Sequence, residues 1–386
     1  MHKKPLVAIF LIVFMSLFGF GLILPLLPFI AEKFGGGAFE IGALASSYSL
    51  VQFFSTPILG QLSDKYGRKK LLIISQVGST IGFVILGLST NLWIVFLSRV
   101  IDGITGGNIS IAQAYISDIT KKEERTKGMS VLGAAFGLGF IFGPAVGGVL
   151  AKYGFWAPAF FAAAISLLTT ILTAVVLEET IDLKKTVKSQ KLKISFFRII
   201  NELKIKPFSY FIITFLVISL AFSLFQGVFA LWAKETYSFG PSENGYLFAY
   251  IGIIAVFTQL KILPIISRKL SERKILLNAL PVFSLGLLIL PIGKSYLLIG
   301  FALLFLAIGN GILGPVLQSM ASKSVKKEEY GEALGILQSA GSIGRVIGPI
   351  AGGKLYELSG RSSPFLISAF IILLLSFYLR GVLSRE

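Results

Sequence analysis

The sequence contains no cysteine and one histidine among its 386 residues, and only 14% of its residues are charged. The absence of cysteine excludes disulfides, and the lack of soft ligands argues against a zinc, copper or iron–sulfur site. Soluble globular chains carry about 25% charged and about 45–50% apolar residues. Here 54% of the residues are hydrophobic and the mean hydropathy is +0.82. This composition predicts an integral membrane protein.

Acidic residues are also few, with 19 Asp and Glu against 36 Lys and Arg, so that the formal net charge is +17. The basic residues fall in short loops between apolar runs, a distribution that argues against nucleic-acid binding. Counted over alternate loops, one set holds 27 of them and the other 6. Because cytoplasmic loops are enriched in Lys and Arg, we predict a plasma-membrane protein with both termini and the long central loop in the cytoplasm.

The apolar residues gather in runs that are each long enough to cross about 30 Å of hydrocarbon as a helix. These runs cover 6–30, 41–60, 71–89, 92–117, 128–150, 155–177, 208–232, 243–264, 275–292, 295–319, 333–353 and 363–380. The predicted fold class is an all-α integral membrane protein with twelve transmembrane helices.

A long polar stretch at 178–207 divides these runs into two sets of six. We therefore predict an N-terminal six-helix bundle at 1–178, a cytoplasmic linker at 179–207 and a C-terminal six-helix bundle at 208–386. Shifting the chain by 205 residues aligns 106–148 with 311–353 and gives 14 identities in 43 ungapped positions. Two related six-helix halves are typical of a transporter whose site lies near the membrane midplane.

The loop after the second run reads GQLSDKYGRKK over residues 60–70. Gly60 and Gly67 allow a tight turn and close helix approach. Asp64 can cap a short turn or the start of the next helix, and it can pair with Arg68. The pattern resembles the loop between the second and third helices of the major facilitator superfamily. The resemblance implies a cytoplasmic latch that holds the outward-facing state, and Asp118 could complete an Asp–Arg–Asp relay. The alternative is an ordinary basic turn.

The fourth run contains Arg99 and Asp102, three residues apart on one helix face and near the middle of the bilayer. A charge there costs at least about 2.5–3.5 kcal/mol unless it is compensated. Asp102 is the only acidic residue deep within a predicted span, so we interpret it as the proton-coupling site, with Arg99 tuning its proton affinity. The alternative is a structural ion pair.

The fifth run carries small residues four apart, a spacing that gives a flat face for close helix packing. The residues are Gly139, Gly143, Pro144, Gly147 and Gly148. The pattern resembles the antiporter motif of the same superfamily, and residues 128–148 resemble tetracycline-resistance-type efflux proteins. This resemblance implies a drug:proton antiporter. Ordinary small-residue packing is the alternative.

In this fold the first, fourth, seventh and tenth spans line the cavity, which suggests aromatic and amide side chains as substrate contacts. The candidates are Phe14, Phe18, Asn108, Gln113, Phe222, Phe225, Gln226, Phe229 and Asn310, with Arg345 of the eleventh span as a contact for an anionic group. Packing or lipid-facing roles are the alternative for each Phe. The first span lacks the carboxylate common in cation exporters, which favours neutral, zwitterionic or anionic substrates.

The sequence thus predicts a secondary transporter, not an enzyme, that exports small lipophilic compounds by proton antiport and alternating access. We expect a monomer in the bilayer, with protons and substrate as partners and no cofactor besides the proton gradient. A lipid or metabolite exporter and a proton symporter remain alternatives on the same scaffold. A non-transporting membrane sensor is a further alternative, although it would favour a folded soluble module.

Overall fold

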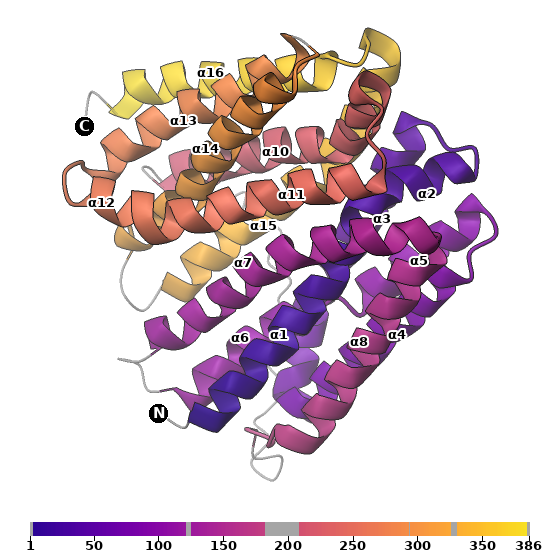
Figure 1. Ribbon diagram of the computed structural model, residues 1–386. Helices are drawn as coiled ribbons and strands as arrows, with labels where there is room; N and C mark the ends of the chain where they lie inside the picture. The colour runs from indigo at the N-terminus through magenta and orange to yellow at the C-terminus, as the bar shows by residue number, and fades with distance from the viewer. Residues whose placement is uncertain (1–2, 121–124, 182–207, 293, 326–329, 384–386) are drawn as a thin grey trace. The chain divides into compact units, whose positions relative to one another are not determined.

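The computed structural model describes residues 3–120, 125–181, 208–292, 294–325 and 330–383, and every regular segment in these ranges is helical (Figure 1). The helices of the first half are α1 (Lys3–Ile23), η1 (Leu24–Leu26), α2 (Leu27–Lys33), α3 (Ala38–Tyr66), α4 (Arg68–Gly87), α5 (Leu92–Ile104), α6 (Asn108–Ile119), α7 (Arg125–Leu150), η3 (Ala151–Tyr153) and α8 (Trp156–Val176). Those of the second half are α10 (Phe208–Tyr237), α11 (Pro241–Phe257), η5 (Thr258–Ile262), α12 (Leu263–Ser267), α13 (Glu272–Ile289), η6 (Leu290–Ile292), α14 (Tyr296–Lys323), α15 (Tyr330–Ser359) and α16 (Ser363–Leu383).

The apolar runs form membrane-length helices. Ten helical segments within the described ranges are long and apolar enough to cross a membrane. The two other predicted spans lie in α3 and α15, which are 29 and 30 residues long. At about 1.5 Å per residue both exceed the hydrocarbon thickness of about 30 Å. The prediction of twelve helical spans is confirmed.

Three spans that the sequence predicts as single helices are interrupted in the structure. In the first, η1 begins beside Pro25, which supplies no backbone donor to a continuing helix. In the fourth, Thr105–Gly107 separates α5 from α6. In the eighth, α11 passes into a π-helical turn, η5, ahead of Pro264. Apolar run length predicts that a segment spans the membrane but does not report such breaks.

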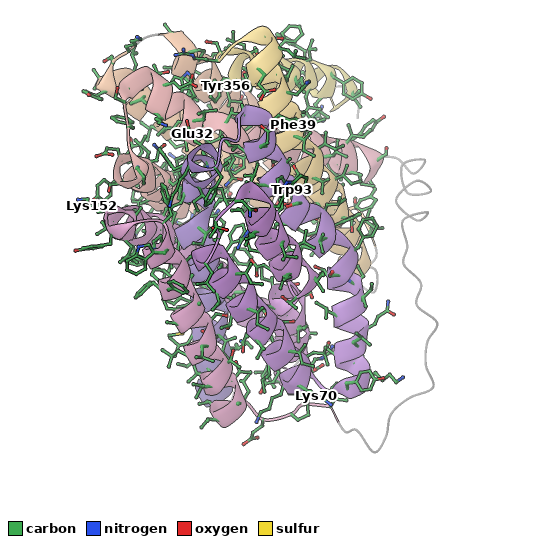
Figure 2. All side chains as sticks on the ribbon, turned by 90° about the vertical axis from the view of Figure 1, so that its right-hand side faces the viewer. Glu32, Phe39, Lys70, Trp93, Lys152 and Tyr356 are labelled. Carbon is green, nitrogen blue, oxygen red and sulfur yellow. The ribbon has the colours of Figure 1, made fainter. Side chains whose placement is uncertain are left out.

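The chain forms two compact units. Unit 1 comprises Met1–Gly35, Ser47–Ile194 and Gly240–Ala249. In unit 1, α1 lies against α7 and α8, while α4 packs on α5 and α8 (Figure 1). Its buried core includes Ile9 and Ile12 of α1, Leu72 of α4 and Ile111 of α6. Figure 2 shows Lys70 at one end of this unit, away from Glu32 and Lys152.

Unit 2 comprises Gly36–Ser46, Ser195–Phe239 and Tyr250–Glu386. Here α10 packs on α15, and α13 lies between α14 and α16 (Figure 1). An aromatic cluster joins α10 to α16, with ring centroids 4.8 Å apart for Phe225 and Phe229 and 5.3 Å apart for Trp232 and Phe365. This cluster forms a core of unit 2.

Each compact unit contains a short segment from the other half of the chain, so the units differ from the predicted bundles 1–178 and 208–386. Residues 36–46 pack in unit 2, where a Cβ on Gly42 would overlap the carbonyl oxygen of Pro349. Residues 240–249 pack in unit 1, where a Cβ on Gly245 would overlap the carbonyl oxygen of Pro144. In both units, a glycine in the first turns of a helix packs against the proline of the repeated Gly-Pro pair. These helices are α3 in unit 2 and α11 in unit 1.

Candidate functional site

The first candidate site is the turn between α3 and α4, where Arg68 uses three guanidinium nitrogens on three partners. Its Nη2 lies 2.5 Å from Oδ1 of Asp64, and its Nε lies 3.0 Å from Oδ2 of Asp118. Its Nη1 donates to Oγ of Ser63 at 2.6 Å. The Arg68 side chain is only 9% exposed. The structure thus brings together the predicted Asp–Arg–Asp relay, whose role as a latch stays a prediction.

The start of α4 is held by a residue that the sequence interpretation missed. Glu179 accepts hydrogen bonds from the backbone N–H groups of Arg68 at 2.8 Å and Lys69 at 3.2 Å. A carboxylate at a helix N-terminus satisfies free donors and interacts favourably with the helix dipole. Asp64, suggested above as a possible cap for this helix, pairs with Arg68 instead.

The two glycines of this loop motif differ in structural role. Gly67 has φ +102°, and a Cβ there would overlap Oε2 of Glu179. Both the backbone conformation and the carboxylate contact therefore require a glycine. Gly60 lies inside α3, and nothing lies within 4 Å of the point that a Cβ on this residue would occupy. The expectation of a tight turn is wrong for Gly60, and its close approach to another helix stays a prediction.

The first residues of the predicted linker contact the Arg68 site. Thr180 donates through Oγ1 to Oδ2 of Asp118 at 3.0 Å. The hydroxyl of Tyr115 donates to the backbone carbonyl of Glu178 at 3.1 Å. Residues 178–180 thus tie the segment after α8 to α6. The rest of the predicted linker, 182–207, lies outside the described residues.

The second candidate site is the ion pair in α5. Arg99 Nη1 lies 3.4 Å from Oδ2 of Asp102, and both side chains are almost completely buried. The Arg99 guanidinium also lies over the ring of Phe83 at 5.7 Å. Its Nη2 has no hydrogen-bond partner among the described residues. This ion pair is long and leaves one guanidinium donor unused. Protonation of its carboxylate therefore breaks fewer hydrogen bonds, and costs less free energy, than protonation within a fully bonded pair.

Close packing of α4 on α5 surrounds this pair with helix backbone. A Cβ on Gly82 would lie 3.1 Å from both Cβ of Asp102 and the carbonyl oxygen of Ser98. One turn earlier, a Cβ on Gly78 would overlap the side chain of Thr105. Small residues four apart therefore let α4 approach the ionisable residue closely.

The break between α5 and α6 begins at Thr105, three residues after Asp102. Gln52 of α3 donates through Nε2 to the carbonyl oxygen of Gly106 at 3.0 Å and to the Tyr48 hydroxyl at 2.9 Å. A neighbouring side chain thereby satisfies a carbonyl that the broken helix leaves free. Beyond the break, the predicted substrate residue Asn108 has a buried Oδ1 with no hydrogen-bond partner among the described residues. Discontinuous helices of this kind form ion and substrate sites in transporters.

The glycines of the fifth-span motif face two different neighbours. Toward α1, a Cβ on Gly139 would lie 2.7 Å from Cβ of Leu17, and one on Gly143 would lie 2.8 Å from the carbonyl oxygen of Phe18. Gly147 continues this face against Leu22. Gly148 instead faces the start of α11, where Ser242 Oγ donates to its carbonyl oxygen at 2.9 Å. The expected small-residue packing is present, while a role in antiport stays a prediction.

The predicted substrate residues of the first half occupy different environments. Phe14 and Phe18 are half-buried, with ring centroids 5.8 Å apart, and Phe18 also meets Phe161 of α8 at 6.4 Å. Gln113 is exposed on α6. Their contact with substrate stays a prediction.

The predicted substrate residues of the second half also occupy different environments. Phe225 and Phe229 are fully buried in the unit 2 core, so in this structure their faces are taken by other aromatic rings. Phe222, Gln226 and Asn310 are half-buried. Arg345 is exposed and donates through Nη2 to Oγ of Ser342 on its own helix at 2.7 Å. Phe225 and Phe229 are thus placed in core packing, which was the alternative interpretation, and Phe14 packs against the core of unit 1.

Some of the residues that the sequence interpretation missed carry a signal in the sequence, and others do not. Gln52 and Tyr48 are polar groups inside an apolar run, a signal that could have suggested them. Glu179 has no comparable signal, because it stands in a charged stretch of ordinary composition. Within the described part of the chain, no group of three His, Cys, Asp or Glu residues could hold a metal ion.

Comparison with known proteins gives a consistent assignment. The family profile described as Major Facilitator Superfamily matches residues 9–322 and 262–385. The chain is 31% identical over 366 residues to the "Tetracycline resistance protein, class E" of Escherichia coli, covering 92% of this chain and 89% of that protein. It is 29% identical over 367 residues to the "Multidrug resistance protein 2" of Bacillus subtilis, covering 94% and 90%.

A solved structure agrees in fold. The human organic anion transporter MFSD10 matches with a TM-score of 0.73 at 24% identity, covering 98% of this chain and 99% of that one. The predicted architecture of two six-helix bundles is therefore confirmed.

Proposed function

The chain belongs to the Major Facilitator Superfamily and is a membrane transporter, and on this basis we propose that it exports small lipophilic compounds in exchange for protons. The relatives named for tetracycline and multidrug resistance support this substrate class. The antiporter-like glycines of α7 support the direction. We further propose that the protein acts as a monomer in the plasma membrane, with both termini in the cytoplasm.

The observation that carries the proposal is the buried Arg99–Asp102 pair in the last two turns of α5, ahead of the break in the fourth span. Burial raises a carboxyl pKa, whereas a neighbouring guanidinium lowers it. A conformational change that alters the distance between these two groups would therefore change the proton affinity of Asp102. Substrate binding near the break would then favour release of the proton from Asp102.

Arg68 has a different part in the proposed mechanism. The turn that it organises lies at the end of unit 1 that also carries Lys70. The break is remote from this turn, because Thr105 packs against Gly78, ten residues further along α4. We assign it to the equilibrium between inward- and outward-facing states, which a ligand shifts only through its differential affinity for the two states. No ATP-binding motif or metal is needed, because the proton gradient supplies the energy.

The decisive experiment uses purified protein in liposomes with an imposed pH gradient. The test compounds are tetracycline and lipophilic dyes of neutral, cationic and anionic charge. We expect Asp102→Asn to abolish uphill transport and substrate-induced proton release while it retains binding. Asp102→Glu keeps the carboxylate and should keep measurable coupling. Normal uphill transport by a well-folded Asp102→Asn variant would contradict the assignment and direct attention to Glu32 or Glu332.

The experiment also separates the alternative on the same scaffold. Substrate that accumulates on the side toward which protons flow would identify a symporter. Comparing the transport rates of the neutral, cationic and anionic dyes tests the expectation that neutral, zwitterionic or anionic compounds are preferred.

A further inference from the structure

Unit 2 contains a basic pocket at the start of α13 and the end of α16. The pocket has a volume of about 400 Å³ and is lined by Arg273, Lys274, Leu277, Asn278 and Arg380. Its size lies within the range of about 300–1,000 Å³ that is usual for small-ligand sites. Three of its five lining residues are cationic and none is acidic. In Figure 1 the C-terminal end of α16 lies beside α13, and both helices contribute lining residues.

The positive charge of this pocket is not neutralised within the described part of the chain. No ion pair there involves the side chains of Arg273, Lys274 or Arg380. The adjacent carboxylate of Glu272 is already engaged, because its Oε1 accepts from Lys323 Nζ at 2.8 Å and from Ser319 Oγ at 2.6 Å. The pocket therefore presents three cations and the amide of Asn278 to an external anion.

The surroundings distinguish a lipid from a dissolved anion. Phe377 precedes Arg380 by three residues and so shares its helix face, and it is 67% exposed. Leu374, one turn earlier on α16, is 52% exposed. An apolar surface that leads from the membrane-spanning part of α16 to a basic pocket suits acyl chains below a charged headgroup. The loop charge count puts this end of the unit at the cytoplasmic leaflet, where anionic lipids attract basic segments.

We propose that this pocket binds the phosphodiester headgroup of an anionic phospholipid. Arg273 and Arg380 reach the phosphate oxygens from two helices, and Lys274 adds a point charge. Asn278 donates to the headgroup, and Leu277 contacts its glycerol region. The site is separate from the Arg68 and Arg99 sites of unit 1 and does not depend on which substrate is transported.

The test measures phosphatidylglycerol binding to the purified full-length protein by native mass spectrometry, with phosphatidylcholine as the comparison lipid. Each direct contact of a charged side chain with the phosphate strengthens binding at least about tenfold, so removal of three should weaken binding at least about 100-fold. We expect this loss in the combined Arg273→Gln, Lys274→Gln and Arg380→Gln variant. The matched control, Lys70→Gln with Arg268→Gln and Lys269→Gln, removes the same charge from exposed or half-exposed positions outside the pocket and should keep near-normal affinity.

A single-residue variant and a titration with dissolved anions complete the test. Arg380→Gln alone, at the exposed last turn of α16, should weaken phosphatidylglycerol binding about tenfold, and it replaces the combined variant if that variant does not fold. Inorganic phosphate and glycerol phosphate are titrated separately to test for a dissolved anion. Equal losses in variant and control, or no preference for phosphatidylglycerol over phosphatidylcholine, would overturn the proposal. Binding of inorganic phosphate as tight as that of the lipid would overturn the assignment to a lipid.

Discussion

At the residue scale, Arg68 depends on guanidinium shape as well as on charge, since its three nitrogens meet Asp64, Asp118 and Ser63 separately. A lysine ammonium is a single point charge and cannot hold three partners in this planar arrangement. Because Asp64 is largely exposed, its own pairing with Arg68 is weakened by solvent. Most of the binding strength at Arg68 should come from the contacts with Asp118 and Ser63.

We predict that Arg68→Lys and Arg68→Ala both lower transport at least about tenfold, since one hydrogen bond to a charged group contributes about 1.5–3 kcal/mol. Asp64→Asn should lower it too. Membrane insertion and ligand binding should stay near wild type, because the turn is remote from the break in the fourth span. Initial rates in proteoliposomes provide the measurement, with the exposed neighbour Lys65→Gln as the control. Wild-type rates in the Arg68 variants would refute the latch role.

Glu179 offers an independent test of the same turn. Glu179→Gln keeps the shape but removes the charge that faces two backbone donors at the start of α4. A cap of this kind contributes about 0.5–2 kcal/mol. We predict a thermal unfolding midpoint a few degrees lower and slower transport. Glu178→Gln is the matched control, because Glu178 contributes only its backbone carbonyl. Equal behaviour of the two variants would show that the carboxylate of Glu179 is not needed.

At the element scale, the packing of α1 on α7 depends on the absence of side chains on one face of α7. Gly143 lies against the carbonyl oxygen of Phe18 and the backbone of Gly21. Gly348 repeats this in unit 2, where a Cβ would lie 3.0 Å from the carbonyl oxygen of Leu220 on α10. Backbone cannot move aside as a flexible side chain can, so both helix pairs should be sensitive to one added methyl group.

We predict that Gly143→Ala destabilises the protein by about 1–3 kcal/mol, the usual cost of overpacking. Gly133→Ala, ten residues earlier in the same helix, is the control because nothing lies within 4 Å of the added Cβ. That control should be neutral or slightly stabilising, since alanine is the better helix former. Thermal unfolding of both variants in detergent measures the difference. A Gly143→Ala variant as stable as Gly133→Ala would contradict the close contact.

At the scale of the whole molecule, the loop charges predict which end of each helix faces the cytoplasm. The chain contains no cysteine, so every single-cysteine variant reports one position without background. We predict that Lys65→Cys resists an impermeant thiol reagent in intact cells and reacts after permeabilisation, while Lys152→Cys reacts in intact cells. Labelling of Lys65→Cys from outside would overturn the predicted orientation, and with it the leaflet assigned to the basic pocket.

The twelve spans, the duplication and the family are all predictable from the amino-acid sequence. These properties follow from run length, from charge counts and from motifs read within short windows, and none of them needs a long-range contact. The pairing of Arg99 with Asp102 was also predictable, because positions three apart in a helix share a face. The relay of Asp64, Arg68 and Asp118 was suggested by a resemblance.

The residues that complete these sites come from distant parts of the chain and are visible in the folded protein alone. Glu179 reaches Arg68 across 111 positions, and Gln52 reaches Gly106 across 54. Such contacts depend on how each helix is rotated about its axis. In a membrane, apolar faces turn toward both lipid and protein, so hydrophobic periodicity does not fix that rotation. For the same reason the sequence could not separate Phe225, buried in a core, from Phe377, exposed on the surface.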